Sequence, residues 1–332
     1  MNKNKASLKN KLYRKIHWYI YSKSTLKKCV VHFYPSYRHR NVKPGSDDIS
    51  TLYITQIPNE GAGIGHQISN LNSGIHAAEV FGINFAYPGF RGKEDWEQFL
   101  GFNQNCKSIE ELKKEGYKIR TLPYFHYEEN SDKATNDSLE LTRRIIKSYA
   151  GKKIIFNVNL DTFYRNQYEV IPYIKSRFEA APERKNDKLI YNNNVINIAV
   201  HIRRGDINKG QLTGDKALTK RWLDMEYYEN IIKKLVMNFE KPYCIYIFSE
   251  GDAKEYRAFE EYGTVKYCFD MSAMDSFLHM VRADYLVLSK SSFSYKPALL
   301  SDGIRICPPG FWHGYPDNEK WIVADENGEF EV

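Results

Sequence analysis

The residues best suited to chemistry stand at the end of one apolar run. Residues 195–200 read Val-Ile-Asn-Ile-Ala-Val, and the run ends in His201-Ile-Arg203-Arg204-Gly-Asp206. Guanidinium groups present a fixed fork of hydrogen-bond donors, which fits the oxygens of a phosphate. An apolar run of this kind is typical of a strand that is buried on both faces of a parallel sheet. The sequence therefore predicts a strand that carries two arginines to its carboxyl end, where α/β sheets bind ligands.

Two later strand ends carry groups that complement the arginines. Residues 243–248 are predicted to form a strand, and the carboxylates of Glu250 and Asp252 follow it, where they can accept hydrogen bonds from a ribose or a guanine edge. Residues 285–289 form another predicted strand, followed by Ser291-Ser292-Phe293-Ser294 at a helix start that favours anions. Because parallel strands end at one edge, we expect the three loops to lie together and to accept a nucleoside diphosphate.

Each of these signals also has a simpler interpretation. An Arg-Arg pair is most often solvated surface, and a Ser-Ser-Phe-Ser run is most often the capped start of a helix. The tripeptide Arg204-Gly-Asp206 also matches an integrin-binding sequence, which we interpret as coincidence. The predicted anion site therefore depends on the coincidence of three strand ends.

A glycine-rich loop near the start of the chain indicates a second ligand-facing element. Residues 52–57 alternate as a strand does, and Gly61-Ala-Gly63-Ile-Gly65-His66-Gln67 follows closely after them. Residues 68–81 then have apolar side chains at helical spacing and stop at Gly82, and a short strand follows at residue 84. This order is typical of a Rossmann-like domain, although the glycine spacing is not that of a dinucleotide site. A tight turn from strand to helix is an equally good interpretation.

The whole pattern predicts an α/β protein with two Rossmann-like domains. Residues 1–49 are expected to be a basic arm and linker, 50–188 an N-terminal Rossmann-like domain, and 189–332 a C-terminal Rossmann-like domain that holds the nucleotide and whose last segment packs back on the first. We predict helices over 222–237, 252–262 and 272–283, the last capped by Ser272. The active site is expected in the cleft between the two domains.

Charge is distributed unevenly along the 332 residues. The net charge is +7, yet residues 1–46 hold 12 basic residues and no acidic one, which leaves 36 basic against 41 acidic residues elsewhere. The body therefore lacks the broad basic face of a nucleic-acid-binding protein, and we expect no nucleic-acid partner. Five cysteines at wide spacings favour a reducing compartment, so we expect the protein in the cytoplasm.

The basic arm has two interpretations, which stay open. No apolar run reaches the roughly 20 residues that span a bilayer, and we see no signal peptide. Residues 8–34 mix basic and large apolar side chains, which predicts either an amphipathic helix on an anionic membrane or a solubilising leader. In the first case the protein would contact the inner membrane face through residues 1–40.

The motifs taken together resemble those of α-1,2-fucosyltransferases. His201-Ile-Arg203-Arg204-Gly-Asp206 is similar to the H-x-R-R-x-D motif of this family, and residues 61–67 resemble its N-terminal glycine loop. Residues 248–252, 274–278 and 289–294 resemble its later motifs in the same order, so the resemblance covers roughly residues 50–315. His66 stands where the family has asparagine, and Tyr295-Lys296 replaces an aromatic pair. These departures indicate a divergent member with a different acceptor or GDP-sugar.

The resemblance implies a GT-B fold and an inverting, metal-independent transfer of fucose from GDP-fucose to a glycan. We see no Asp-x-Asp motif or metal-ligand spacing, so arginine and helix N–H groups would stabilise the leaving group. Besides that donor, or another GDP-sugar, no cofactor is expected. The implied catalytic residues are Arg203, Asp206 and His66. The implied donor-binding residues are His201, Arg203, Arg204, Gly63, Gly65, Gln67, Glu250, Asp252, Ser291, Ser292, Phe293 and Ser294.

Within this set the resemblance suggests separate roles. Arg203 would hold the β-phosphate while Arg204 supports it or orients the loop, and His66 would face the sugar or the acceptor. The base that accepts the acceptor's proton stays unassigned among His66, Asp161 and Asp206, and a dissociative route would need little help from it. The sequence favours a role in microbial surface polysaccharide synthesis. The alternatives are a GT-B transferase with another nucleotide sugar, or a non-catalytic nucleotide- or glycan-binding protein of the same fold.

Overall fold

The computed structural model describes residues 16, 19, 23, 25–26, 34–59, 61–123, 133–158, 162–205, 207–208, 213–214 and 216–331. The candidate base residues Asp161 and Asp206 and most of the basic arm lie outside these described residues. The chain forms two compact units, each of which is described by itself. The first unit contains residues up to 57, 73–88 and 106–163, and the second contains 58–72, 89–105 and 164 onward.

This division differs from the domain boundaries predicted from the sequence. The sequence prediction ends the basic arm at residue 49 and the first domain at residue 188, and it stays a prediction; packing instead groups residues 58–72, 89–105 and 164–188 with the second unit. The division also falls inside one helix, α4 (Ile64–Phe81), between Asn72 and Ser73. The glycine-rich loop therefore belongs by packing to the unit that carries the two arginines, although it lies far from them in the sequence.

The first unit is built on a four-stranded parallel sheet with the order β2-β1-β4-β3. Its central strands β1 and β4 are buried because their side chains are almost all apolar, as in Ile154-Ile-Phe. The helix α6 begins with a capping box, in which Ser108 and Glu111 each accept from the other's backbone N–H. The elements assigned to this unit are α3 (Tyr34–His39), β1 (Tyr53–Thr55), β2 (Asn84–Phe85), α6 (Ile109–Lys114), β3 (Lys118–Thr121), α7 (Lys133–Lys147) and β4 (Ile154–Asn157).

The second unit is built on a six-stranded parallel sheet with the order β10-β9-β8-β5-β6-β7. Its strands are β5 (Ile196–His201), β6 (Tyr243–Phe248), β7 (Val265–Tyr267), β8 (Tyr285–Val287), β9 (Ile304–Cys307) and β10 (Trp321–Val323). Its helices are α5 (Asp95–Leu100), η2 (Gln167–Val170), α8 (Ile171–Ala180), η3 (Pro182–Asn186), α10 (Lys216–Thr219), α11 (Met225–Val236), η4 (Ala253–Tyr262), α12 (Ala273–Arg282) and α13 (Ser292–Leu300).

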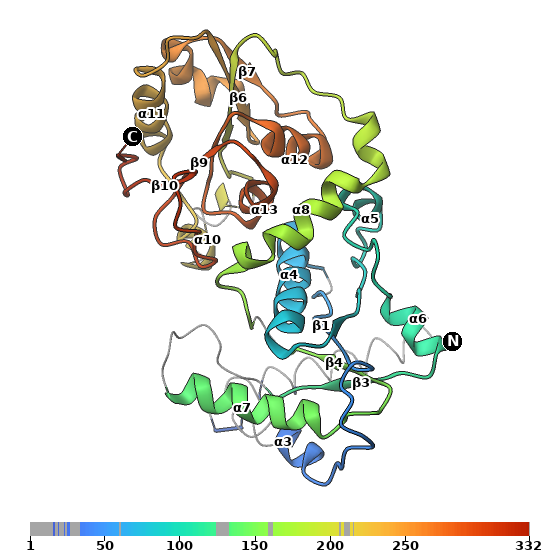
Figure 1. Cartoon of the computed structure of the whole chain (residues 1–332). Coiled ribbons are helices and arrows are strands. Elements are labelled where there is room, and N and C mark those ends of the chain that lie inside the picture. Colours follow the sequence, from blue (N-terminus) through green and yellow to red (C-terminus); the bar gives the residue numbers. More distant parts are fainter. Residues whose placement is uncertain are drawn as a thin grey trace, which may run out of the picture. The chain divides into compact units, whose positions relative to one another are not determined.

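Helices cover both faces of the six-stranded sheet (Figure 1). Ile198 and Val200 of β5 point into a core that includes α11 and η4. On the opposite face, the ring of His201 lies against Phe293 of α13, and Phe248 lies against His279 of α12. Because both faces are covered, the strands read as continuous apolar runs, which is why they could be predicted from the sequence.

The order of the strands creates a topological switch point between β5 and β8. From β5 the chain proceeds through β6 to β7 on one side, and from β8 it proceeds through β9 to β10 on the other. The strands β5 and β8 pair in register, with Ile198 opposite Tyr285 and Val200 opposite Val287. The loops that follow two such strands diverge from each other. In open α/β sheets, the crevice between these loops is the usual ligand site.

The predicted α/β class with parallel sheets is confirmed, and local predictions are met with small differences. Ser272 accepts a hydrogen bond from Asp275 N (3.1 Å) and caps α12 as predicted. Residues 253–262 form a 3₁₀ helix rather than an α-helix, since the first turn closes with Glu255 N donating to Asp252 O. The strand β10 was not predicted. Among the described residues, no helix is both long and apolar enough to cross a membrane.

Candidate functional site

The arginine loop (residues 202–205) and the serine loop (residues 288–294) meet at the switch point. Arg203 Nη1 donates a hydrogen bond to Ser291 Oγ at 3.1 Å. Ser291 is also the N-cap of α13, because its Oγ accepts from the backbone N–H of Phe293 at 3.2 Å. A half-buried guanidinium thus lies at the amino-terminal end of a helix, where the backbone dipole also favours negative charge.

The buried side chain of Arg204 holds the backbone of the arginine loop. Its side chain is only 5% exposed and donates to the backbone carbonyls of Arg203 (3.0 Å) and Leu223 (3.3 Å). The guanidinium also lies 4.0 Å from the centre of the Trp222 ring. Of the two roles suggested by the sequence for Arg204, this geometry favours orientation of the loop, which leaves Arg203 as the candidate for anion binding.

His201 lies beneath the serine loop and is not accessible to a ligand. Its Nδ1 is 2.7 Å from Ser289 Oγ, and the residue is buried. Burial, followed by the charge of Arg203, lowers the pKa of His201 from 6.5 to about 3. A neutral imidazole therefore joins β5 to the loop that follows β8, and we interpret its role as structural support of the site.

This buried histidine predicts a loss of stability in mild acid. Because the folded-state pKa is below the unfolded value of 6.5, the unfolded chain binds more protons, and stability falls as the pH drops from about 6.5 toward 3. The contribution of His201 between pH 7 and pH 5 is about 2 kcal/mol. We expect His201→Gln to weaken the pH dependence of urea unfolding in this range by that amount. An unchanged pH dependence would contradict the assignment.

Glu250 approaches the arginine loop, whereas Asp252 does not. Gly205 has a φ of +52°, and a Cβ atom there would overlap the Glu250 carboxylate, so only glycine fits this turn without strain. Asp252 is exposed and accepts from Lys254 N (3.0 Å) at the start of η4. Of the two predicted ribose- or base-binding carboxylates, Glu250 is thus the one that lies beside the arginine loop, at Gly205.

The glycine-rich loop (residues 61–65) packs on the start of α13. A Cβ atom at Gly65 would lie 2.9 Å from Phe293 N and from the carbonyl carbon of Ser292, so a side chain there would meet backbone. Gly63 has open space instead, and its carbonyl accepts the first hydrogen bonds of α4 from His66 N and Gln67 N. The loop that sequence analysis singled out therefore contacts the serine loop directly, within one compact unit.

His66 and Gln67 follow this loop but occupy different environments. His66 is half-buried, and its Nε2 lies 2.9 Å from Asn59 Nδ2 and 3.1 Å from Tyr164 Oη. Gln67 is fully buried and bonds both the N–H (2.8 Å) and the carbonyl (3.0 Å) of Arg91. The amide of Gln67 is therefore used to hold backbone, while His66 keeps a position from which it could face a substrate.

The remaining predicted residues belong to the internal structure of the serine loop. Ser294 is buried, and its Oγ donates to the carbonyls of Ser289 and Ser291. The Phe293 ring packs beside His201 at 5.6 Å between centroids. Ser292 is half-buried, and its Oγ lies 3.3 Å from His313 Nε2.

Sequence reasoning missed His313, Tyr164 and Ser69, which surround this site. His313 is fully buried and contacts the side chains of both Ser69 and Ser292. The local signal was the aromatic run Phe311-Trp312-His313 after Pro308-Pro-Gly. That run has no periodicity, so its position beside the site could not be inferred from the sequence.

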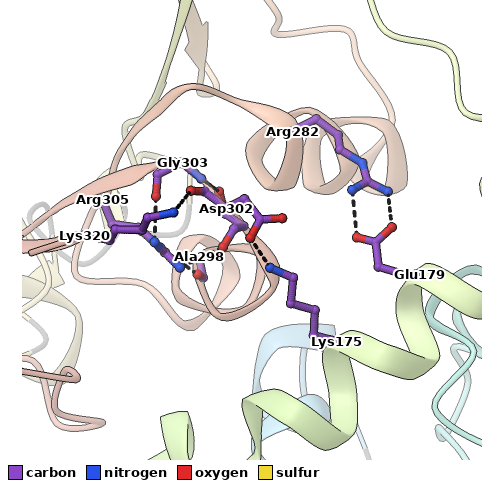
Figure 2. A network of polar contacts seen from close by, with 9 residues as sticks. Lys175, Glu179, Arg282, Ala298, Asp302, Gly303, Arg305 and Lys320 are labelled. Carbon is purple, nitrogen blue, oxygen red and sulfur yellow. Dashed lines mark hydrogen bonds and ion pairs between the residues drawn. The ribbon is translucent and has the colours of Figure 1, made fainter. Parts of the chain in front are cut away.

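The opposite edge of the same sheet has a different character. A cavity of about 410 Å³ lies at the amino-terminal ends of β8 and β9 and is lined by residues that include Asp284 and Lys320. Figure 2 shows Lys175 and Glu179 of α8 reaching Asp302 and Arg282, with both carboxylate oxygens of Glu179 bonded to Arg282 at 2.7 and 2.8 Å. The hydrogen bond from Lys175 lowers the pKa of Asp302. These charged groups are paired with one another, whereas the arginine and serine loops lie at the carboxyl edge, which is therefore the candidate site.

Comparisons with known proteins give distant likenesses only. No protein-family model matches the sequence, and no curated protein matches it. Among solved structures, the chain is similar to POFUT1 in complex with GDP (13% identity, TM-score 0.44, 83% of this chain and 98% of that chain). It is also similar to POFUT1 in complex with GDP-fucose (15% identity, TM-score 0.43, 78% of this chain and 96% of that chain). A third similar structure is the fucosyltransferase NodZ from Bradyrhizobium (12% identity, TM-score 0.42, 76% of this chain and 94% of that chain).

Proposed function

We propose that this chain is a glycosyltransferase that moves fucose from GDP-fucose to a hydroxyl group of a glycan. One observation carries the proposal: Arg203 donates to the N-cap serine of α13 at the topological switch point of a parallel sheet. A guanidinium beside the start of a helix at this place suits the diphosphate of a nucleotide sugar. The motif resemblance to fucosyltransferases supports GDP-fucose as the donor, with another GDP-sugar as the alternative.

The proposed chemistry is an inverting displacement. The acceptor oxygen forms a bond to the anomeric carbon of the donor sugar, the bond from that carbon to the β-phosphate oxygen breaks, and GDP leaves with the electron pair. Negative charge grows on the diphosphate as this happens, and Arg203 and the first N–H groups of α13 would stabilise it without a metal ion. Glu250, beside the arginine loop, would accept hydrogen bonds from the ribose or the guanine.

The acceptor hydroxyl must also lose its proton. The candidate that the structure describes is His66, which is half-buried; Asn59 Nδ2 and Tyr164 Oη both contact its Nε2, so that nitrogen would accept this proton only after its partners release it. Asp161 and Asp206 stay candidates as well. We propose that the acceptor is a microbial surface polysaccharide, made by a cytoplasmic enzyme whose basic arm holds it at the inner membrane.

A donor panel tests this proposal directly. Purified protein is mixed with GDP-fucose, GDP-mannose, UDP-glucose or CMP-sialic acid, and release of the free nucleotide is followed with and without a glycan mixture. We expect the fastest release from GDP-fucose and tighter binding of GDP than of UDP or CDP in calorimetric titration. Equal affinity for the three diphosphates would contradict GDP-fucose as donor, and binding of GDP without turnover of any donor would indicate a non-catalytic protein.

A further inference from the structure

A buried imidazole links three segments of the second unit beneath the serine loop. His313 Nε2 lies 3.3 Å from Ser69 Oγ of α4, 3.3 Å from Ser292 Oγ of α13, and 3.2 Å from Trp312 Nε1. On the other side of the ring, Nδ1 lies 2.7 Å from the backbone carbonyl of Tyr164. The side chain of His313 is fully buried, so these contacts are made without competition from water.

The partners of His313 determine which of its nitrogens carries the proton. A carbonyl oxygen can only accept, so Nδ1 must donate to Tyr164. The indole N–H of Trp312 can only donate, so Nε2 must be the unprotonated acceptor. The ring is therefore neutral, consistent with a pKa lowered by burial and then by the charge of Lys296.

A neutral acceptor at this place restricts the orientation of Ser292. Its hydroxyl can share the Nε2 lone pair of His313 with the Trp312 N–H, and this contact fixes the orientation of the Ser292 hydroxyl in the first turn of α13. Ser292 is the first residue of α13 and is next to Ser291, the residue that Arg203 contacts. Gly65 packs on the same residues, and Ser69, the other serine beside the imidazole, donates to the carbonyl of Gly65 at 3.0 Å.

We propose that His313 is a positioning residue for the diphosphate site, which acts by holding Ser292 at the start of α13. This inference rests on the proposed function, since it assumes that the serine loop binds a diphosphate. Lys296 lies one helical turn after Ser292 on the same face of α13, is buried, and donates to Gln167 Oε1. The other charged or titratable group that acts on His313 is His66.

The simpler explanation is that His313 is an ordinary core histidine. The second unit offers a matched control, because His279 has the same chemistry away from the site. His279 is buried, its Nδ1 lies 2.7 Å from the carbonyl of Asp275, and its Nε2 accepts from Ile190 N at 3.0 Å. A purely structural role predicts that equivalent substitutions of the two histidines have equivalent effects.

A double-mutant cycle separates the two explanations. His313→Asn keeps an amide donor near Tyr164 but loses the acceptor for Ser292, whereas His313→Gln places an amide oxygen near the position of Nε2. Affinities for GDP and for inorganic pyrophosphate are measured by calorimetry for the wild type, H313N, H313Q, S292A, H313N/S292A and H279N, and thermal unfolding is recorded for each. The proposal predicts about tenfold weaker binding for H313N and for S292A, which corresponds to one hydrogen bond.

The proposal further predicts that the double variant binds about as well as either single variant, because His313 acts through Ser292. H313Q is expected to stay within about threefold of the wild type, and H279N is expected to bind normally even if it unfolds at a lower temperature. Additive losses of affinity in the double variant, or equal losses of affinity in H279N and H313N, would overturn the positioning role of His313 but not the proposed function. If H313N does not fold, a tenfold loss in H313Q overturns it. If the wild type binds neither probe, this inference and the proposed function both fail.

Discussion

Replacing Arg203 with alanine is expected to lower the rate of nucleotide release from the donor by about a hundred- to a thousandfold. The guanidinium lies at the start of α13, where the leaving diphosphate would gain charge. An interaction that strengthens as the bond breaks affects the transition state more than the ground state, so kcat should fall more than donor affinity. Arg203→Lys should recover little, because an ammonium cannot form the fork of two parallel hydrogen bonds.

The control for this prediction is Arg257→Ala. Arg257 is exposed in η4 of the same unit, so its removal changes the net charge equally but leaves the arginine loop intact. Initial rates at several GDP-fucose concentrations give kcat and KM for each variant. Turnover of Arg203→Ala within about threefold of the wild type would refute the assignment of Arg203, since a charge-stabilising donor has a much larger effect.

Replacing Gly65 with serine is expected to destabilise the second unit by about 1–3 kcal/mol and to weaken nucleotide binding. The new Cβ would lie 2.9 Å from two backbone atoms at the start of α13, and backbone in a first helical turn cannot rotate aside as a side chain can. Either α4 or α13 must shift, so the separation between the glycine-rich loop and the serine loop must grow.

Gly63→Ser provides the matched control for stability. Gly63 has no atoms near its hypothetical Cβ, and serine is a favoured residue before a helix. Urea unfolding should therefore show a loss for Gly65→Ser and none for Gly63→Ser. Equal stability of the two variants would mean that the close packing of Gly65 on α13 is not present in solution.

Those features of the fold that depend on local pattern could be predicted from the sequence. The apolar run before His201 identified β5, and similar runs identified β6 and β8, because strands covered on both faces leave a continuous apolar signal. Since all six strands are parallel, prediction of the strands also predicted that their following loops meet at one edge. The contact between Arg203 and Ser291 is a result of that geometry.

Features that depend on contacts distant in sequence could not be predicted. The burial of Arg204 depends on Leu223 and Trp222, and the burial of Gln67 depends on Arg91. The sequence does not show these partners, so it predicted that both side chains contact a ligand. His313 carries no periodic signal and joins residues of three separate segments. The start of α4 at Ile64 was also missed, because the glycines before and after it conceal the helical pattern.

The pairing of β5 with β8 has a consequence for how the protein acquires its site. His201 and Ser289 are separated by 88 positions in the chain, and between the paired strands lie β6, β7 and the helices α10, α11, η4 and α12. Closing so long a segment costs chain entropy before any contact compensates for it, and proteins rich in such distant contacts fold slowly. A folding intermediate that contains only β5, β6 and β7 would hold Arg203 without Ser291. Ligand binding should therefore stabilise the fully assembled sheet over such an intermediate, and a nucleotide in the refolding buffer should raise the yield of native protein.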